Sequence, residues 1–139
     1  MQLNRQTDYA LRAVLYLASH PLANIGEVAE AQFVPQDFLA KIIQKLSRAG
    51  IVKTHRGVGG GISLARPPEK INMLEVIEAL EGPLALNRCF SHPGECPREY
   101  FCAIHDELAT VQASLARSLA KIDMGRLARK ERAKPKARR

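Results

Sequence analysis

The 139-residue sequence lacks the long apolar segments that a membrane protein requires. A transmembrane helix needs about eighteen or more consecutive apolar residues, and no such run occurs, so an interaction with the membrane is not expected. The first eight residues are mostly polar, which argues against a secretory signal. The simplest interpretation is a cytoplasmic chain that forms one domain with appendages.

The patterns typical of enzymes are also missing. There is no C-x-x-C pair and no nucleophile–base pair at a useful spacing. The glycines at 57–61 form neither a G-x-G-x-x-G fingerprint nor a phosphate-binding loop, since no helix pattern follows them. We therefore expect a protein that is not an enzyme and has no small-molecule substrate.

Cysteine is scarce, and the number is odd. The three cysteines argue against a disulfide framework and favour metal ligands or reactive thiols. All three lie between residues 89 and 105, together with two of the four histidines. This segment has the spacing C-x6-C-x5-C-x2-H and is interrupted by proline and glycine, which would let the side chains converge.

The net charge of +7 is unevenly distributed along the chain. Residues 125–139 contain eight basic residues and one acidic residue, while residues 1–124 contain thirteen of each sign. Within the neutral part, residues 1–66 have a net charge of +4 and residues 67–124 of −4. A basic N-terminal half indicates a polyanion-binding face that belongs to the fold itself.

Apolar periodicity predicts helices over residues 7–19, 24–32 and 36–49. Two short helices joined by a tight turn, the second with amide and basic groups outside, are typical of a helix-turn-helix motif. Such groups can pair with base edges and phosphates. In residues 36–49 the inward apolar face comprises Phe38, Leu39, Ile42, Ile43 and Leu46. The residues expected to face DNA are Gln36, Asp37, Ala40, Lys41, Gln44, Lys45 and Arg48.

A predicted β-hairpin follows this motif directly. Residues 51–56 and 62–65 have strand composition, and the glycines between them can adopt positive φ. A hairpin in this position is typical of a wing, whose tip can approach a phosphate or the minor groove. The wing residues expected to contact DNA are Arg56, Gly57, Gly59 and Gly60.

A long helix is predicted over residues 98–124. Ile104, Val111 and Ser118 form one seven-residue series, and Leu108, Leu115 and Ile122 form another. This pattern predicts pairing with a second copy of the chain. The fold is therefore expected to be mainly α with a small β-hairpin wing. Its predicted parts are a winged helix-turn-helix domain at 1–82, a cysteine loop at 83–103, a dimerisation helix at 98–124 and a basic disordered tail at 125–139.

Several motifs together resemble the family of bacterial winged-helix regulators that includes IscR, NsrR and RirA, most closely the NsrR branch. They are the N-terminal Met-Gln-Leu and Thr-Asp-Tyr-Ala-Leu-Arg-Ala, the helix segment Lys-Ile-Ile-Gln-Lys-Leu-Ser-Arg-Ala-Gly, the wing Arg-Gly-Val-Gly-Gly-Gly-Ile and the cysteine loop. The resemblance implies a homodimeric regulator of promoter DNA, expected to be a repressor, whose iron–sulfur cluster senses nitric oxide, iron or redox state.

The same resemblance implies the ligands of the cluster. Cys89, Cys96 and Cys102 match the three thiolate positions. Asp8 matches the aspartate that NsrR-like proteins supply from the partner subunit to a [4Fe–4S] cluster, and His105 matches the histidine that IscR-like proteins supply to a [2Fe–2S] cluster. From the residues alone, three other interpretations stay open: a structural zinc site, free thiols in a metal-free redox switch, and inert buried cysteines.

Overall fold

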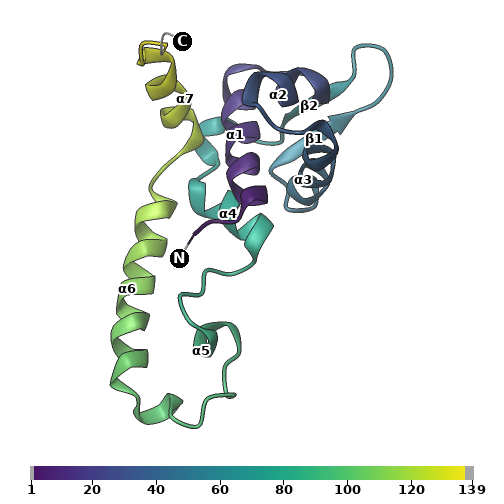
Figure 1. Cartoon of the computed structure of the whole chain (residues 1–139). Helices are drawn as coiled ribbons and strands as arrows, with labels where there is room; N and C mark the ends of the chain where they lie inside the picture. The colour runs from purple at the N-terminus through teal and green to yellow at the C-terminus, as the bar shows by residue number, and fades with distance from the viewer. Residues whose placement is uncertain (1, 137–139) are drawn as a thin grey trace.

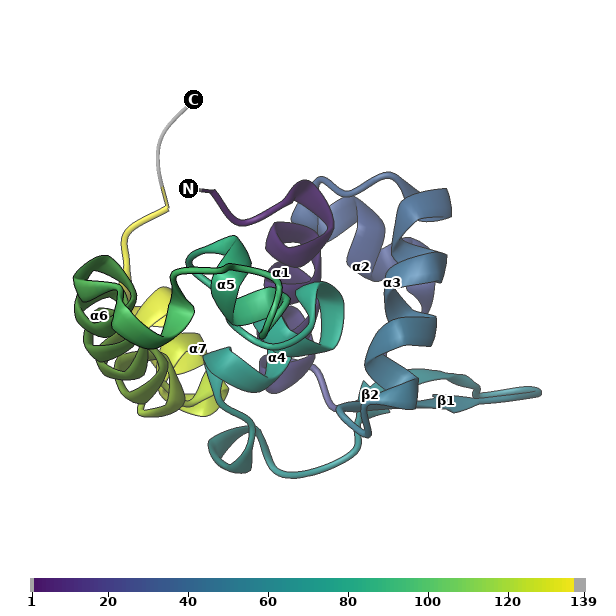
Figure 2. The same cartoon turned by 90° about the horizontal axis from the view of Figure 1, so that it is seen from below.

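The computed structural model describes residues 2–136 of the chain. Figures 1 and 2 show a cluster of helices with a β-hairpin projecting from one side, and a long helix that extends away from this cluster. The predicted fold class, mainly α with a small wing, is confirmed. The elements are α1 (Arg5–Ser19), α2 (Ile25–Gln32), α3 (Gln36–Arg48), β1 (Val52–His55), β2 (Gly61–Leu64), η1 (Pro68–Lys70), α4 (Met73–Glu81), α5 (Arg88–Ser91), η2 (Glu99–Phe101), α6 (Ala103–Ala120) and α7 (Met124–Ala133).

Asparagine side chains cap α1, α2 and α4 in the same way. The Oδ1 atoms of Asn4, Asn24 and Asn72 each accept a hydrogen bond from the backbone amide three residues later, which begins α1, α2 and α4. At Asn72 the capping box is complete, since Glu75 also accepts from the Asn72 amide at 3.0 Å. Asn24 and Asn72, each with a Glu three residues later in the sequence, therefore mark true helix starts.

The helix-turn-helix motif is formed by α2 and α3. Phe33 ends α2 in the left-handed conformation (φ 56°), and Pro35 takes the N-cap position of α3. The hairpin follows at once, with Val52 paired to Leu64 and His55 paired to Gly61. Ala23 adds a bridge to Ile62 on the other side of β2, which fixes the wing against the start of α2.

The hydrophobic core lies among α1, α2, α3, α4 and the base of the hairpin. Its largest fully buried side chains include Leu39, Ile42 and Leu46 of α3 and Val76 and Ile77 of α4. Phe38 was predicted to join this core but is 49% exposed. It precedes Leu39 by one position, which places it about 100° away from the centre of the buried face of α3.

The prediction of a disordered tail over residues 125–139 is wrong for most of its length. Residues 124–133 form α7, which packs against α1 and buries Met124 and Ala128 in the core. Asp123 caps the helix by accepting a hydrogen bond from the Arg126 amide at 2.7 Å. Met124, Gly125 and Ala128 are buried and Leu127 packs against the core, and these residues anchor a helix of otherwise charged composition. Residues 137–139 lie outside the described part of the chain.

The predicted helix at 98–124 is shorter in the structure. Cys102 is extended (φ −96°, ψ 110°), so α6 begins only at Ala103. At the other end, the Met73 amide donates to the Ile122 carbonyl at 2.8 Å, and the Met124 amide donates to the Ile71 carbonyl at 2.9 Å. This bridge takes Ile122 out of helical geometry and returns the chain to the core, where α7 starts.

Candidate DNA-binding face and cysteine cavity

The outer face of α3 carries the polar residues that were predicted to read DNA. Asp37, Lys41, Gln44 and Arg48 are exposed, as are Gln36 and Ala40 toward one flank. Lys45 differs from the others. It is half-buried, and its Nζ donates to Gln6 Oε1 in α1 at 3.0 Å. Lys45 therefore links two helices of the domain, whereas the other positions are free to meet a ligand.

The wing tip is open and conformationally specialised. Gly57 (φ 86°) and Gly59 (φ 78°) occupy the left-handed region that favours glycine. Gly60 is constrained by space, because a Cβ atom added there would lie 2.4 Å from the carbonyl oxygen of His55. Arg56 is exposed beside these glycines, and Figure 2 shows the hairpin projecting away from the helices. Val58 at the tip is fully exposed. The sequence analysis did not list it among the wing residues that could contact DNA, although it lies within the glycine run.

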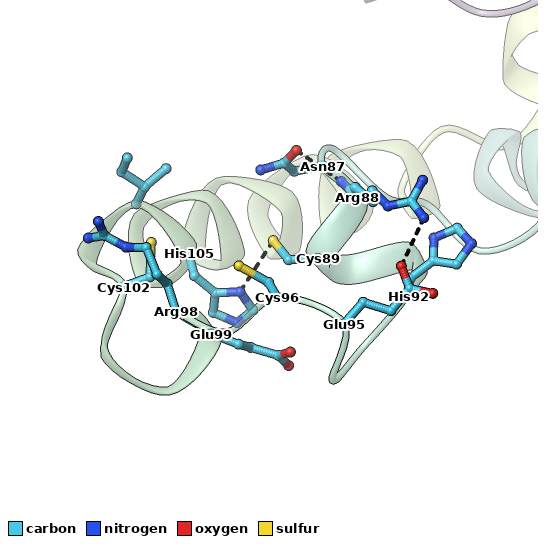
Figure 3. Close-up of a pocket in the computed structure, with 11 residues that line it drawn as sticks. Asn87, Arg88, Cys89, His92, Glu95, Cys96, Arg98, Glu99, Cys102 and His105 are labelled. Atoms are coloured by element: carbon cyan, nitrogen blue, oxygen red, sulfur yellow. Dashed lines mark hydrogen bonds and ion pairs between the residues drawn. The ribbon is translucent and has the colours of Figure 1, made fainter.

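The three cysteines line one cavity of about 490 Å³. Cys89 lies in α5, Cys96 lies in the loop that follows α5, and Cys102 directly precedes α6. His105 projects into the same cavity from the first turn of α6 (Figure 3). All three thiols are free and half-buried. The structure thus brings together four of the five metal ligands that the sequence suggested.

The four side chains share the cavity without meeting at one point. His105 Nδ1 lies 3.4 Å from Cys89 Sγ, and its ring packs against Phe90 with the ring centroids 4.8 Å apart. Among the described residues, no three His, Cys, Asp or Glu side chains lie close enough together to hold one metal ion. The donor set nevertheless suits a soft metal centre, because thiolates and imidazole line a space large enough to receive one.

Charged side chains form the rim of the cavity, and the sequence analysis did not identify them. Arg88 pairs with Glu95 at 2.9 Å, and Glu99 accepts a hydrogen bond from the Gly94 amide at 2.6 Å. These contacts hold the loop between α5 and η2 across its proline and glycine positions. In the sequence these residues are ordinary charged loop residues, so nothing in their spacing indicated the role.

Asp8 lies outside the cavity formed by its own chain. It sits in the first turn of α1 and pairs with Arg12 at 2.7 Å, with the side chains of both residues about half exposed. An acidic residue in this position also interacts favourably with the helix dipole. Of the two residues predicted as the fourth ligand, His105 lines the cavity of its own chain and Asp8 does not.

Among the described residues, no helix is both long and apolar enough to cross a membrane.

Comparison with known proteins finds relatives with similar sequences. The chain is 40% identical over 112 residues to Protein aau3 of Rhizobium meliloti (strain 1021), a match that covers 78% of this chain and 72% of the relative. It is also 40% identical over 94 residues to the HTH-type transcriptional regulator NsrR of Shouchella clausii (strain KSM-K16), covering 66% of this chain and 63% of that protein. The chain thus spans a little under two thirds of that regulator.

The solved structure of T. potens IscR superposes with a TM-score of 0.77 at 25% identity, covering 99% of this chain and 94% of that one. A sequence model of the Rrf2 family, described as "Iron-dependent Transcriptional regulator", matches residues 3–130. These matches bear out the predicted resemblance, and a family of regulators agrees with the expectation that the chain is not an enzyme. The chain belongs to the Rrf2 family of transcriptional regulators.

Proposed function

We propose that this regulator is a repressor whose affinity for promoter DNA is set by an iron–sulfur cluster bound in the cysteine cavity. The observation that carries the proposal is that three cysteines from three separate segments line one cavity together with an imidazole. Inert core cysteines would instead be buried among apolar side chains, and all three are partly accessible. When bound, the cluster would supply a centre that nitric oxide, iron shortage or oxidation can alter.

Cys89, Cys96 and Cys102 would hold the cluster as thiolates, with His105 as the fourth ligand. His105 lines the cavity together with the three cysteines, and its Nδ1 is 3.4 Å from Cys89 Sγ. Asp8 is paired with Arg12 in its own chain, so it could serve only from a second subunit after that ion pair breaks. This arrangement favours His105, which in turn favours the [2Fe–2S] cluster over the [4Fe–4S] cluster of the resemblance.

The regulator would act as a homodimer joined through α6. None of the described α6 side chains is buried within the chain, and Ile104, Val111 and Leu115 are 65%, 54% and 37% exposed. These positions lie on one helical face, and their burial against a second copy would remove a large apolar area from water. Two-fold pairing would also present two α3 helices to a palindromic site.

DNA would be read by the outer face of α3 and touched by the wing. Lys41 and Gln44 are the exposed donors best suited to base edges, with Asp37 able to accept from cytosine. Arg56 and the backbone of the glycine tip would contact phosphate or the minor groove. Lys45 is left out of this set because its ammonium group is bound to Gln6.

The test is anaerobic purification followed by iron, sulfide and zinc analysis and DNA binding. We expect visible absorption with stoichiometric iron and sulfide, lost in Cys96→Ala and weakened or shifted in His105→Ala but not in His92→Ala. His92 is the matched control because it also lines the cavity but matches no ligand position. Binding is measured on an operator selected from random DNA by the loaded protein. Loss of the cluster should change the affinity of the protein for this operator.

Two outcomes would replace the proposal. A colourless protein with one zinc per chain would make the cavity a structural zinc site. A protein that binds no metal, but whose DNA affinity changes when its thiols are oxidised, would be a thiol switch. The thiols are free and gathered without converging, which is the observation that keeps this second function open.

A further inference from the structure

A single carboxylate joins the root of the cysteine loop to the start of α1. Glu81 is the last residue of α4, and Gly82 ends that helix at φ 80° before the chain enters the loop. Glu81 Oε1 accepts hydrogen bonds from the Asn4 amide at 2.8 Å and from Thr7 Oγ1 at 2.7 Å. The Glu81 carboxylate is therefore bonded to the residues with which α1 begins.

Thr7 makes this contact specific. Among the described residues it is the one buried polar side chain, with 0% exposure. Its hydroxyl also lies 2.9 Å from Asn4 Oδ1, but that oxygen already accepts from the Thr7 amide at 2.8 Å. The hydroxyl has one proton, and an ionised carboxylate at the shorter distance is the stronger acceptor. Donation to Glu81 therefore ties the buried Thr7 hydroxyl of α1 to the end of α4.

The same turn of α1 is bonded to α3 on its other side. Gln6 Oε1 accepts from Lys45 Nζ at 3.0 Å, and both side chains are half-buried. In Figure 1, α1 lies beside both α4 and α3, and residues 4–7 bond to each of them. Lys45 lies one position after Gln44, which is exposed on the DNA-facing side. A shift of this turn would therefore move the last turn of α3.

The loop beyond Glu81 is anchored to the cavity side of the molecule. The Leu86 amide donates to Gln112 Oε1 of α6 at 2.8 Å, and α5, which carries Cys89, starts at Arg88. The path from Cys89 to Lys45 thus consists of a short covalent segment, the Glu81 carboxylate, residues 4–7 and the Gln6 amide. No other acidic residue of α4 bonds to α1 among the described residues.

We propose that Glu81 is the positioning residue through which the state of the cysteine cavity sets the placement of α3. The inference rests on the proposed function, since it names the contact that transmits the change. Rearrangement of the loop on gain or loss of the cluster would pull on the end of α4. Because Glu81 accepts two hydrogen bonds from residues 4–7, that turn would follow, and Lys45 would carry α3 with it.

The experiment compares operator affinity with and without the cluster in four proteins: wild type, Glu81→Ala, Glu81→Gln and Glu107→Ala. For coupled sites the wild-type ratio is expected to be about 5- to 150-fold. Glu81→Ala should bring the ratio to within about twofold of unity, while Glu81→Gln should restore it because its amide oxygen still accepts both bonds. Glu107→Ala removes the same charge from the exposed side of α6 and should keep the wild-type ratio.

A second readout uses the cluster-free protein and needs no DNA. In amide hydrogen exchange, Glu81→Ala should speed exchange in residues 4–8 and 41–48, and Glu107→Ala should not. Thr7→Val removes the donor while keeping a buried β-branched side chain, and it should lower the affinity ratio in the same direction. If Glu81→Ala does not fold, judged by circular dichroism, the Thr7→Val result decides alone.

The outcomes separate the two proposals. If wild type binds the operator equally with and without the cluster, the proposed function fails, whatever Glu81 does. If wild type shows the ratio but both Glu81→Ala and Thr7→Val retain it in full, the coupling runs elsewhere and the inference is overturned. Loss of the ratio in Glu81→Gln as well as Glu81→Ala would also overturn it, because the hydrogen-bond geometry would then not be what transmits the change.

Discussion

Replacing Met124 with alanine tests whether the C-terminal helix is part of the folded domain. Met124 is 1% exposed and belongs to the core cluster with side chains of α1 and α4. Its amide also donates to the Ile71 carbonyl at 2.9 Å, a bond that the substitution leaves in place. The variant therefore removes side-chain packing alone, at a position that composition would assign to a basic tail.

The expected loss follows from the burial. Truncating a fully buried methionine to alanine typically lowers the free energy of unfolding by about 2–5 kcal/mol, because a cavity remains. Domains of this size have total stabilities of about 5–15 kcal/mol. For a chain of 139 residues, a loss of 1 kcal/mol in the free energy of unfolding lowers Tm by about 4 °C. We expect Tm to fall by roughly 8–20 °C on this scale.

The assay is urea and thermal unfolding followed by circular dichroism, with Lys130→Ala as the matched control. Lys130 lies in the same helix, is exposed, and should change the unfolding free energy by less than about 0.5 kcal/mol. Equal stability of the two variants would refute the packing of α7 against α1. The tail would then be the solvated segment that its charge suggests.

Three further predictions concern the wing, α3 and α1. Gly60→Ala should lower the unfolding free energy by about 1–3 kcal/mol and weaken DNA binding, because its Cβ would meet the His55 carbonyl at 2.4 Å; unchanged melting would contradict this. Gln44→Ala should weaken binding to the selected operator by about 1–3 kcal/mol and leave random DNA almost unaffected, and equal losses would show that it reads no base. Burial, followed by the hydrogen bond to Glu27, raises the pKa of Tyr16 above 10.0. The stabilisation of the folded state by the protonated Tyr16 hydroxyl is therefore present below pH 10.0 and is lost as the pH rises through the folded pKa. Urea midpoints of wild type should therefore fall faster above about pH 10 than those of Tyr16→Phe.

The sequence predicted the elements whose signals are local. Asn24 and Asn72 stand before apolar runs with a Glu three residues on, and the capping chemistry works within one turn. The glycines of the wing indicate positive φ for the same local reason, and Gly57 and Gly59 adopt it. The DNA contacts assigned to α3 and the wing stay predictions, although the structure exposes most of those residues.

The errors arose where contacts distant in sequence decide the structure. The bridge of Ile122 and Met124 to residues 71–73 ends α6 early, and no pattern within the heptads announces it. Burial of Ala128 against α1 turns a charged segment into a packed helix, although its composition resembles a solvated tail. The DNA contact of Lys45 stays a prediction, but its hydrogen bond to Gln6, which is distant in sequence, was not indicated by the pattern of α3.

The positions of Asp8 and His105 bear on how the two ends of the molecule communicate. His105 is in the cavity with the cysteines, while Asp8 is on the same turn of α1 that contacts Glu81 and Lys45. If the cavity takes His105 as its fourth ligand, the proposed route from the cavity to α1 runs through the chain to the end of α4. If a partner's aspartate were the ligand, the cluster would act on α1 directly. Asp8→Ala separates the two routes, because it should leave the affinity ratio intact only when the signal passes through Glu81.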